Sequence, residues 1–240
     1  MALIEIGELE KIYLDGKVST TALKKISLNI EHGEFVAIMG PSGSGKSTLL
    51  HIMGFLDRPT KGLYRFDGKT ADDFSDDGLA RIRNIQMGFI FQSFNLLPRT
   101  SVFENVKLPL LYSEMPENQW DKRVGEVIEA VGLSHRAYHE PAELSGGEKQ
   151  RAAIARALVN HPEVIFADEP TGNLDSKSGQ AVMDIIQGLN EDKGHTIVLI
   201  THETDTAEHA SRIIRLHDGS IESDEKVLPG RRHARHMFNK

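Results

Sequence analysis

The segment Gly40-Pro-Ser-Gly-Ser-Gly-Lys-Ser47 constrains the fold of this chain more than any other feature. Two glycines separated by four residues and followed by lysine and serine are typical of a phosphate-binding loop between a strand and a helix. Both neighbours fit, because residues 35–38 form an apolar run of strand length and residues 47–53 have a helical pattern. The alternative is a glycine-rich turn with a chance lysine, a coincidence expected in about one chain in a hundred of this size.

The residue types in this loop predict a division of roles. Glycines let consecutive backbone N–H groups turn inward around phosphates, at the positive end of the following helix. We expect Lys46 to contact the β- and γ-phosphates of ATP and the Ser47 hydroxyl to ligate Mg²⁺. The predicted cofactor-binding residues of the loop are Gly40, Pro41, Ser42, Gly43, Ser44, Gly45, Lys46, Ser47 and Thr48.

Apolar patterning predicts an α/β core. Residues 2–38 are β-rich, and short apolar runs bounded by polar residues recur at 164–167 and 196–200, as in a parallel sheet that is covered on both faces. From about residue 79 to 160 the periodicity is mostly helical, which predicts an inserted helical subdomain. Its clearest helix carries Val124, Val127, Ile128 and Val131 on one face and ends near Gly132.

The C-terminal residues predict a small hairpin and then a loss of pattern. Apolar residues at 213–216 and 221 flank Asp218-Gly219, a dipeptide typical of hairpin turns. Residues 223–240 are basic and poor in apolar side chains, so we expect a solvated, flexible tail. Binding of this tail to a membrane surface or to a partner is the alternative.

Composition excludes several function classes. A net charge of −7 argues against nucleic-acid binding as the main role, since that needs a surplus of Lys and Arg. The absence of cysteine excludes thiol catalysis and thiolate zinc sites. We expect no signal peptide, and no apolar run reaches the roughly 18 residues that a membrane helix needs, so any link to a membrane is expected through a partner.

A second pair of chemical groups follows the apolar run at 164–167, where Asp168 and Glu169 supply two carboxylates. Asp168 is suited to anchoring Mg²⁺ and Glu169 to orienting the attacking water, because carboxylates at the carboxyl edge of a parallel sheet face the ligand crevice. An ordinary strand end is the alternative for the pair taken alone. Its combination with Lys46 favours the catalytic interpretation.

The third motif is Leu144-Ser-Gly-Gly-Glu148, which precedes a helix predicted at Lys149–Val159. Ser145, Gly146 and Gly147 form a second potential anion-binding helix N-terminus, although a simple helix cap explains most such triplets. Together with the phosphate loop and Asp168-Glu169, this motif resembles the signature motif of ABC-type ATPases. The resemblance extends from about residue 3 to 222.

The resemblance implies a fold and a domain organisation. The fold is a P-loop NTPase core with a mainly parallel sheet, an N-terminal antiparallel β subdomain and an inserted helical subdomain at about 93–160. The ABC ATPase domain spans residues 1–222, and the tail spans 223–240. One departure is Glu148-Lys149, where many relatives have two glutamines, and we expect no effect of this difference on catalysis.

Further site residues follow from the same resemblance. Gln92 matches the glutamine near Mg²⁺, His202 the switch histidine that contacts the γ-phosphate, Tyr13 the aromatic that stacks on adenine, and Gly172-Asn-Leu-Asp175 the D-loop at the dimer interface. Taken singly, Gln92 and Tyr13 are more simply a surface amide and a sheet aromatic. The implied catalytic set is Lys46, Gln92, Glu169 and His202, and the implied metal set is Ser47, Gln92 and Asp168.

The resemblance also implies an assembly. In such ATPases the signature of one subunit completes the phosphate site of the other, so Ser145, Gly146 and Gly147 should contact ATP in the partner of a head-to-tail, ATP-dependent homodimer. The stretches 96–110 and 169–175 resemble the branch of macrolide exporters, lipoprotein-release systems and a cell-division ATPase. This branch implies a separate membrane permease and a cytoplasmic location on the inner face of the membrane, with export or periplasmic mechanotransmission as the work done.

Several alternatives remain open at this stage. Phe94, Leu96, Leu97 and Phe103 either form a groove for a coupling helix of the permease or only pack the helical lobe. Two further alternatives are an ATPase that regulates a division-type membrane partner without transport and one that binds ATP while scarcely hydrolysing it. A soluble ABC ATPase that acts on DNA or ribosomes is disfavoured by the acidic charge balance and by the lack of a coiled-coil insertion or a second cassette.

Overall fold

In the computed structural model, residues 2–16 and 18–228 are described, and the β-rich N-terminus is a long antiparallel hairpin. The described residues fall into two units, one comprising residues up to 80 together with those from 194, the other residues 81–193. We describe each unit separately. Helix α2, Asp76–Ile85, crosses the boundary between them along the chain.

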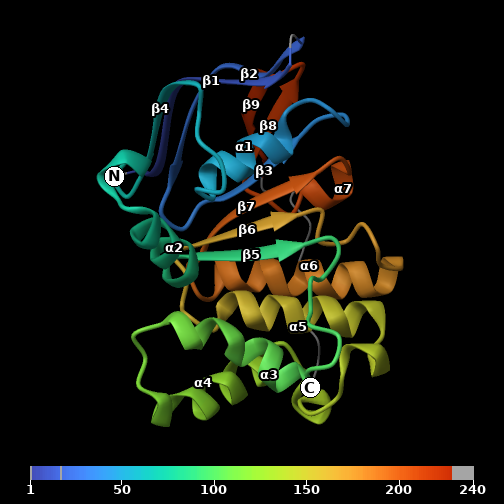
Figure 1. Cartoon of the computed structure of the whole chain (residues 1–240). Helices are drawn as coiled ribbons and strands as arrows, with labels where there is room; N and C mark the ends of the chain where they lie inside the picture. Colours follow the sequence, from blue (N-terminus) through green and yellow to red (C-terminus); the bar gives the residue numbers. More distant parts are fainter. Residues whose placement is uncertain (1, 17, 229–240) are drawn as a thin grey trace. The chain divides into compact units, whose positions relative to one another are not determined.

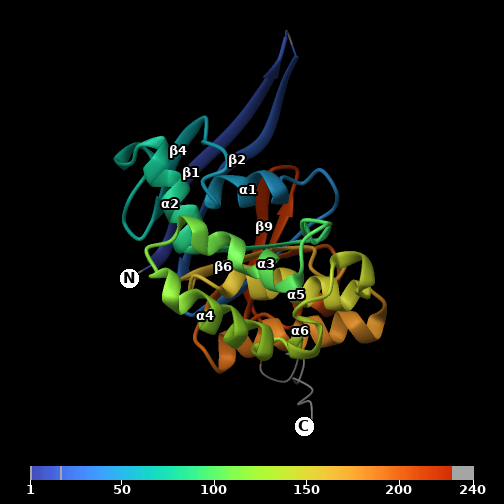
Figure 2. The same cartoon turned by 60° about the horizontal axis from the view of Figure 1, so that its bottom comes forward.

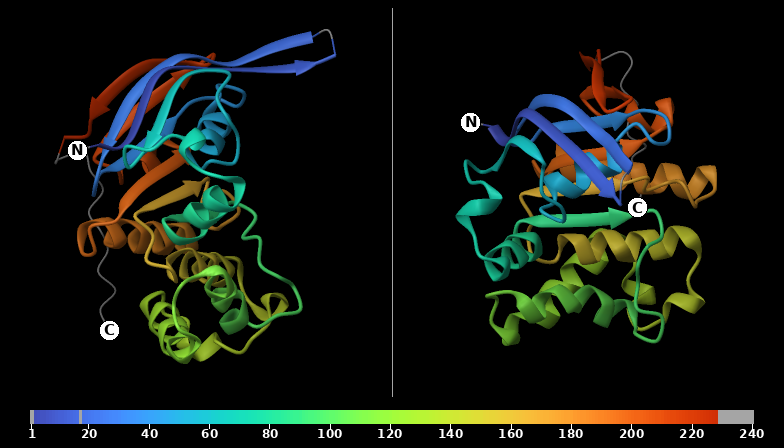
Figure 3. Two further views of the ribbon diagram at one scale, coloured as in Figure 1. Left: turned by 60° about the vertical axis from the view of Figure 1, so that its left-hand side comes forward. Right: turned by 45° about the horizontal axis from the view of Figure 1, so that its top comes forward.

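The first unit contains an antiparallel sheet of order β2-β1-β4. β1 pairs with β4 only as far as Glu10, so the last residues of β1 pair with β2 alone. Figure 3 shows this end of the hairpin extending past β4. The strands are β1 (Ala2–Asp15), β2 (Val18–Glu31) and β4 (Lys61–Phe66).

The same unit contains a parallel group of strands that precedes the phosphate loop. β3 (Phe35–Met39) is buried along its whole length and pairs in parallel with β7 (Thr196–Thr201) and β8 (Arg212–His217). This burial on both faces explains why β3 is an unbroken apolar run. Helix α1 (Lys46–Met53) follows β3, and the unit also contains the short helices η1 (Ala71–Asp73) and α7 (Thr204–Ala207); α1 and α7 are labelled in Figure 1.

The predicted hairpin near residue 218 is present. β8 pairs antiparallel with β9 (Ser220–Lys226), and Asp218 and Gly219 between them both have positive φ, as a tight two-residue turn requires. Residues 223–226, which the sequence assigned to the tail, therefore lie in β9. Residues 227 and 228 follow β9, with the Val227 N–H donating to the Ser211 carbonyl at 2.9 Å, and residues 229–240 of the predicted tail lie outside the described residues.

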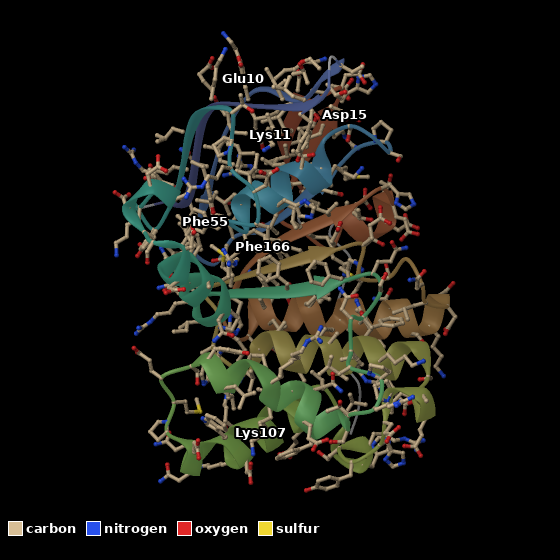
Figure 4. The ribbon with its side chains drawn as sticks, in the orientation of Figure 1. Glu10, Lys11, Asp15, Phe55, Lys107 and Phe166 are labelled. Atoms are coloured by element: carbon tan, nitrogen blue, oxygen red, sulfur yellow. The ribbon has the colours of Figure 1, made fainter. Side chains whose placement is uncertain are left out.

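The second unit combines two parallel strands with the expected helices. β5 pairs with β6, and the Phe89 and Phe166 rings stack across them with centroids 5.5 Å apart (Phe166 is labelled in Figure 4). Helices α3, α4 and α5 contact one another, as Figure 2 shows, and α5 also contacts α6. The elements are β5 (Met87–Phe91), α3 (Val102–Lys107), η2 (Leu108–Tyr112), α4 (Glu117–Ala130), η3 (Ser134–Arg136), η4 (Pro141–Glu143), α5 (Gly146–Leu158), β6 (Val164–Asp168) and α6 (Ser176–Glu191).

Two details differ from the sequence-based expectation. The mostly helical stretch also contains β5, because a five-residue apolar run is too short for its periodicity to separate strand from helix. Helix α5 begins at Gly146 and not at Lys149, since Ser145 is its N-cap and Glu148 closes a capping box. No helix within the described part of the chain is long and apolar enough to span a bilayer.

A pair of glycines tests the packing of the second unit. A Cβ at Gly88 in β5 would lie 2.8 Å from the Ala157 carbonyl oxygen, whereas nothing lies within 4 Å of the corresponding position at Gly125 in α4. We expect Gly88→Ala to lower the free energy of unfolding by about 1–3 kcal/mol through overpacking. We expect Gly125→Ala to raise it by about 0.5–1 kcal/mol through helix propensity.

Urea denaturation of the two variants beside the wild-type protein measures both changes. A Gly88→Ala variant as stable as the wild-type protein would contradict the close approach of β5 to the last turn of α5.

Candidate nucleotide-binding site

The phosphate loop is a tight connection between β3 and α1 in which glycine is required by close contacts. A Cβ at Gly40 would lie 2.2 Å from the Leu216 carbonyl oxygen and 2.6 Å from Ser44 Oγ. Gly45 has φ 102°, a conformation that side-chain-bearing residues rarely adopt, and its Cβ would lie 2.6 Å from the Ala22 carbonyl oxygen. The loop conformation therefore depends on these two glycines.

Helix α1 begins without a side-chain cap. Its N-cap is Gly45, which offers no side-chain acceptor, and its first turn contains no acidic residue. The first N–H groups of any helix lack intrahelical partners, so this end attracts an anion. Ser44 Oγ adds a buried hydroxyl without a hydrogen-bond partner, and such orphaned polar groups indicate a missing ligand.

Lys46 reaches back over the same loop. Its Nζ donates to the carbonyl oxygens of Gly40 at 2.7 Å and Pro41 at 2.8 Å, and only 8% of the residue is exposed. The ammonium group is thus held at the loop and not in solvent, while Ser47 on the first turn of α1 is exposed. Closely packed glycines, an uncapped helix N-terminus, a hydroxyl and a fixed ammonium together fit a phosphate chain.

Tyr13 near the end of β1 is held by neighbours that the sequence did not identify. Its hydroxyl donates to Asp57 Oδ2 at 2.8 Å and also interacts with Thr48 of the phosphate loop. Lys11, labelled in Figure 4, lies 2.6 Å from Asp57 Oδ1 and 4.8 Å from the Tyr13 ring centroid. These contacts connect Tyr13 to the phosphate loop within the first unit and leave the residue 41% exposed.

The charges around Tyr13 are coupled through Asp57. Partial burial and the hydrogen bond to Asp57 raise the pKa of the Tyr13 phenol. Burial alone would raise the pKa of Asp57, but hydrogen bonds from Lys11 and Tyr13 outweigh it and lower that pKa. Asp57 is therefore a carboxylate at neutral pH, able to hold both partners.

His202 is the remaining predicted site residue of the first unit. It follows the last residue of β7 directly, and its side chain is exposed. Glu203, the N-cap of α7, donates its N–H to Thr201 Oγ1 at 3.1 Å, which fixes the backbone on either side of the histidine.

In the second unit, the ends of β5 and β6 bring Gln92, Asp168 and Glu169 together. Phe91 is paired with Asp168 in the parallel register, so Gln92 and Glu169 both leave the sheet at the same level. Buried Gln150 on α5 connects the ends of β5 and β6. Its Nε2 donates to the Pro170 carbonyl at 2.8 Å and to the Phe91 carbonyl at 3.3 Å. No motif in the sequence predicts this role for Gln150.

The residues after β6 contact Gln92 closely. A Cβ at Gly172 would lie 2.6 Å from Gln92 Nε2, and Asn173 Nδ2 donates to the Gln92 carbonyl at 3.0 Å. Glu169 has φ 44°, a left-handed conformation that is rare for residues other than glycine and that clusters at functional sites. The D-loop residues thus support the glutamine that the resemblance assigned to the metal.

The signature residues Ser145, Gly146 and Gly147 form the first turn of α5 and its cap. Ser145 Oγ accepts the Glu148 N–H at 3.3 Å, and the Glu148 carboxylate accepts the Ser145 N–H at 2.8 Å. A Cβ at Gly147 would lie 3.0 Å from Ser178 Oγ at the start of α6. Gly147 is therefore required for packing between the two helices, whatever it contacts outside the chain.

The oxygen donors predicted for Mg²⁺ are suited to that ion. Ser47, Gln92 and Asp168 offer a hydroxyl, an amide oxygen and a half-buried carboxylate, the hard ligands that Mg²⁺ combines with phosphate oxygens and water. Ser47 belongs to the first unit, and Gln92 and Asp168 to the second.

Comparison with known proteins identifies the family. The ABC transporter family profile matches residues 23–172. The chain is 52% identical over 225 residues to the macrolide export ATP-binding/permease protein MacB of Bdellovibrio bacteriovorus, covering 94% of this chain and 34% of that protein. It is also 52% identical to the uncharacterized ABC transporter ATP-binding protein MJ1508 of Methanocaldococcus jannaschii, covering 91% of this chain and 97% of that one.

A solved structure agrees with these matches. The dimeric, post-hydrolysis structure of the ATP-binding cassette MJ0796 bound to ADP and Pi has a TM-score of 0.85 and 45% identity, and covers 94% of this chain and 99% of that one. The chain spans about a third of the MacB-type relatives and nearly the whole of MJ1508.

The family model covers more than half of the chain, and the relatives match it almost from end to end. The expected fold class is confirmed by the strands and helices of both units and by the neighbouring structure. The expected ABC-type ATPase cassette is confirmed by the same comparisons. The chain therefore belongs to the ABC transporter family of ATP-binding proteins.

Proposed function

We propose that this chain binds ATP with Mg²⁺ and hydrolyses it as the motor subunit of an ABC transporter, driving export or periplasmic mechanotransmission through a separate membrane permease. The observation that carries this proposal is the phosphate loop, where the uncapped N-terminus of α1 meets a glycine cradle and the fixed Lys46 ammonium. The named function of the MacB-type relatives supports export as the work done.

The proposed chemistry assigns one task to each residue. The α1 N-terminus and Lys46 bind the β- and γ-phosphates, and Tyr13 stacks on adenine while Asp57 holds its hydroxyl. Ser47, Asp168 and Gln92 are the proposed Mg²⁺ ligands. When bound, the ion offsets negative charge on the phosphate oxygens.

Glu169 and His202 act on the reacting groups in this proposal. The Glu169 carboxylate orients a water and accepts its proton as the water oxygen attacks the γ-phosphorus. The bond from that phosphorus to the ADP oxygen breaks, the ADP oxygen keeps the electron pair, and phosphate leaves. His202 donates a hydrogen bond to the γ-phosphate. The left-handed backbone of Glu169 supports a functional role, because such strain persists only where surrounding contacts hold it.

The proposed assembly is an ATP-dependent homodimer in which Ser145, Gly146 and Gly147 of one copy contact ATP in the other. The dimeric structures of MJ0796 support it. The dimer works on the inner face of the cell membrane, bound to its permease. Apolar side chains after Gln92, with Leu97 45% exposed, are the proposed contact for that permease.

The water-orienting role predicts the behaviour of a Glu169→Gln variant. We expect it to bind ATP, to lose at least about a hundredfold in turnover, as loss of a general base does, and to accumulate as an ATP-dependent dimer in gel filtration. The matched control is Glu163→Gln, since Glu163 is exposed just before the same strand. Turnover of Glu169→Gln at the wild-type rate would refute the assignment.

The adenine role of Tyr13 predicts a contrast between two variants. Tyr13→Ala should raise the KM for ATP about tenfold, since stacking of a base on an aromatic ring is worth about 1–3 kcal/mol. Tyr13→Phe keeps the ring and loses only the hydroxyl contacts with Asp57 and Thr48, so its KM should stay within about twofold of the wild-type value. Steady-state ATPase assays measure both, and equal KM values for the two variants would exclude stacking.

The membrane role is tested by purification from detergent-solubilised membranes of the native source. We expect an integral membrane permease to copurify with the chain in a stable complex. A stable complex with DNA or ribosomes in place of a membrane protein would overturn the transporter role while leaving the ATPase role intact.

A further inference from the structure

The two helix N-termini assigned to phosphate differ in charge. The first turn of α1 contains no acidic residue, whereas the first turn of α5 contains Glu148. Hydrogen bonding from the Ser145 backbone, together with nearby Arg136, lowers the pKa of the Glu148 carboxyl, so the group is anionic at neutral pH. The signature helix therefore carries its own negative charge where it is proposed to meet ATP.

Two arginines act on this carboxylate: Arg151 interacts with it through its charge, and Arg136 also hydrogen-bonds it. The Nε of Arg136 lies 3.2 Å from Glu148 Oε1, while Glu148 Oε2 accepts the Ser145 N–H. Each carboxylate oxygen thus has one strong donor, and the Glu148 side chain is 15% exposed. Arg136, Glu148 and Ser145 form a short chain of hydrogen bonds that ends at the signature serine.

The guanidinium is itself fixed in place. Arg136 Nη1 lies 3.1 Å from His139 Nε2, and because arginine only donates, His139 accepts this bond through Nε2. The segment that carries both residues is tied to α3, since Val102 and Phe103 donate their N–H groups to the carbonyl oxygens of His139 and Ala137. The segment that places Arg136 beside Glu148 is thus held by backbone hydrogen bonds to α3.

Closing the dimer would take this region out of water. A carboxylate that loses water without a partner is strongly destabilising, and here it would also approach an anionic phosphate chain. We propose that Arg136 is a positioning residue that neutralises Glu148 and so allows the N-terminus of α5 to close on ATP held by a second copy of the chain. This inference rests on the proposed function of the signature residues.

The pairing makes the importance of Arg136 depend on residue 148. A glutamine there could still accept the Ser145 N–H through its amide oxygen, but it carries no charge that needs neutralising. Removing Arg136 should therefore impair dimer formation when Glu148 is present and should change it little in the Glu148→Gln background. If Arg136 only attracted phosphate from a distance, removing it would impair dimer formation equally in the two backgrounds.

The experiment uses the Glu169→Gln variant, in which the ATP-bound dimer accumulates, and measures the ATP concentration that gives half-maximal dimer by gel filtration. We expect Arg136→Gln to raise this concentration about tenfold, as loss of a charge partner at an interface does. Arg136→Lys should recover most of the loss. In the background that also carries Glu148→Gln, Arg136→Gln should change the concentration by less than about twofold.

A charge-matched control is Arg81→Gln, which removes an arginine from a more exposed pair with Glu114 in the same unit and should leave dimer formation unchanged. If Arg136→Gln raises the ATP concentration for half-maximal dimer equally in both backgrounds, or in neither, the proposal that Arg136 acts by neutralising Glu148 is refuted. A large loss of thermal stability in the ATP-free Arg136→Gln monomer would also refute it, since the defect would then lie in folding. If Glu169→Gln with Arg136 and Glu148 intact forms no dimer at any ATP concentration, the proposed function itself fails.

Discussion

The phosphate loop depends on the close packing of three backbone segments at one point of the first unit. The Ser44 carbonyl accepts the Gly219 N–H at 3.0 Å, the Gly219 carbonyl accepts the Lys24 N–H at 2.7 Å, and Gly45 and Gly219 each lie against the Ala22 carbonyl. The loop is thus supported by β2 and by the turn between β8 and β9. Because side chains would separate these segments, the site could not form without glycine at both positions.

This support explains how an uncapped helix start remains ordered. Most helices use an N-cap side chain to satisfy their first donors, and α1 does not. Its position is fixed by backbone contacts and by Lys46, which bonds the carbonyl oxygens of Gly40 and Pro41. The N-terminus of α1 has no side-chain cap, whereas α5 is capped within the chain through Ser145 and Glu148.

Local patterns were predictable from the sequence, and contacts between distant residues were not. The phosphate loop and the turn at Asp218-Gly219 are encoded by consecutive residues, so their conformation follows from composition and spacing. The sequence-based prediction starts α5 at Lys149, three residues after its actual start at Gly146. A serine followed three positions later by glutamate is a capping-box signal, and this signal at Ser145 and Glu148 indicates the observed start.

The supporting partners carried no such signal. Asp57 holds Tyr13 across 44 positions of sequence, and Gln150 reaches the Phe91 carbonyl across 59. A buried glutamine or a half-buried aspartate looks in sequence like any polar residue. Only the fold determines which carbonyl or hydroxyl each one meets, so the sequence predicts residues for chemistry and not the residues that hold them in place.

Gln150 also shows that one helix serves two parts of the proposed site. Glu169 is left-handed and precedes Pro170, a position where sterics already restrict the backbone, so its conformation needs support from neighbours. Gln150 gives that support by bonding the Pro170 carbonyl, and it lies on α5 little more than one turn beyond Ser145. A displacement of the N-terminus of α5 therefore strains the hydrogen bond from Gln150 to the Pro170 carbonyl, which holds the residues that follow β6. Through this single helix, the end proposed to contact a second copy is mechanically connected to the carboxylate proposed to orient water.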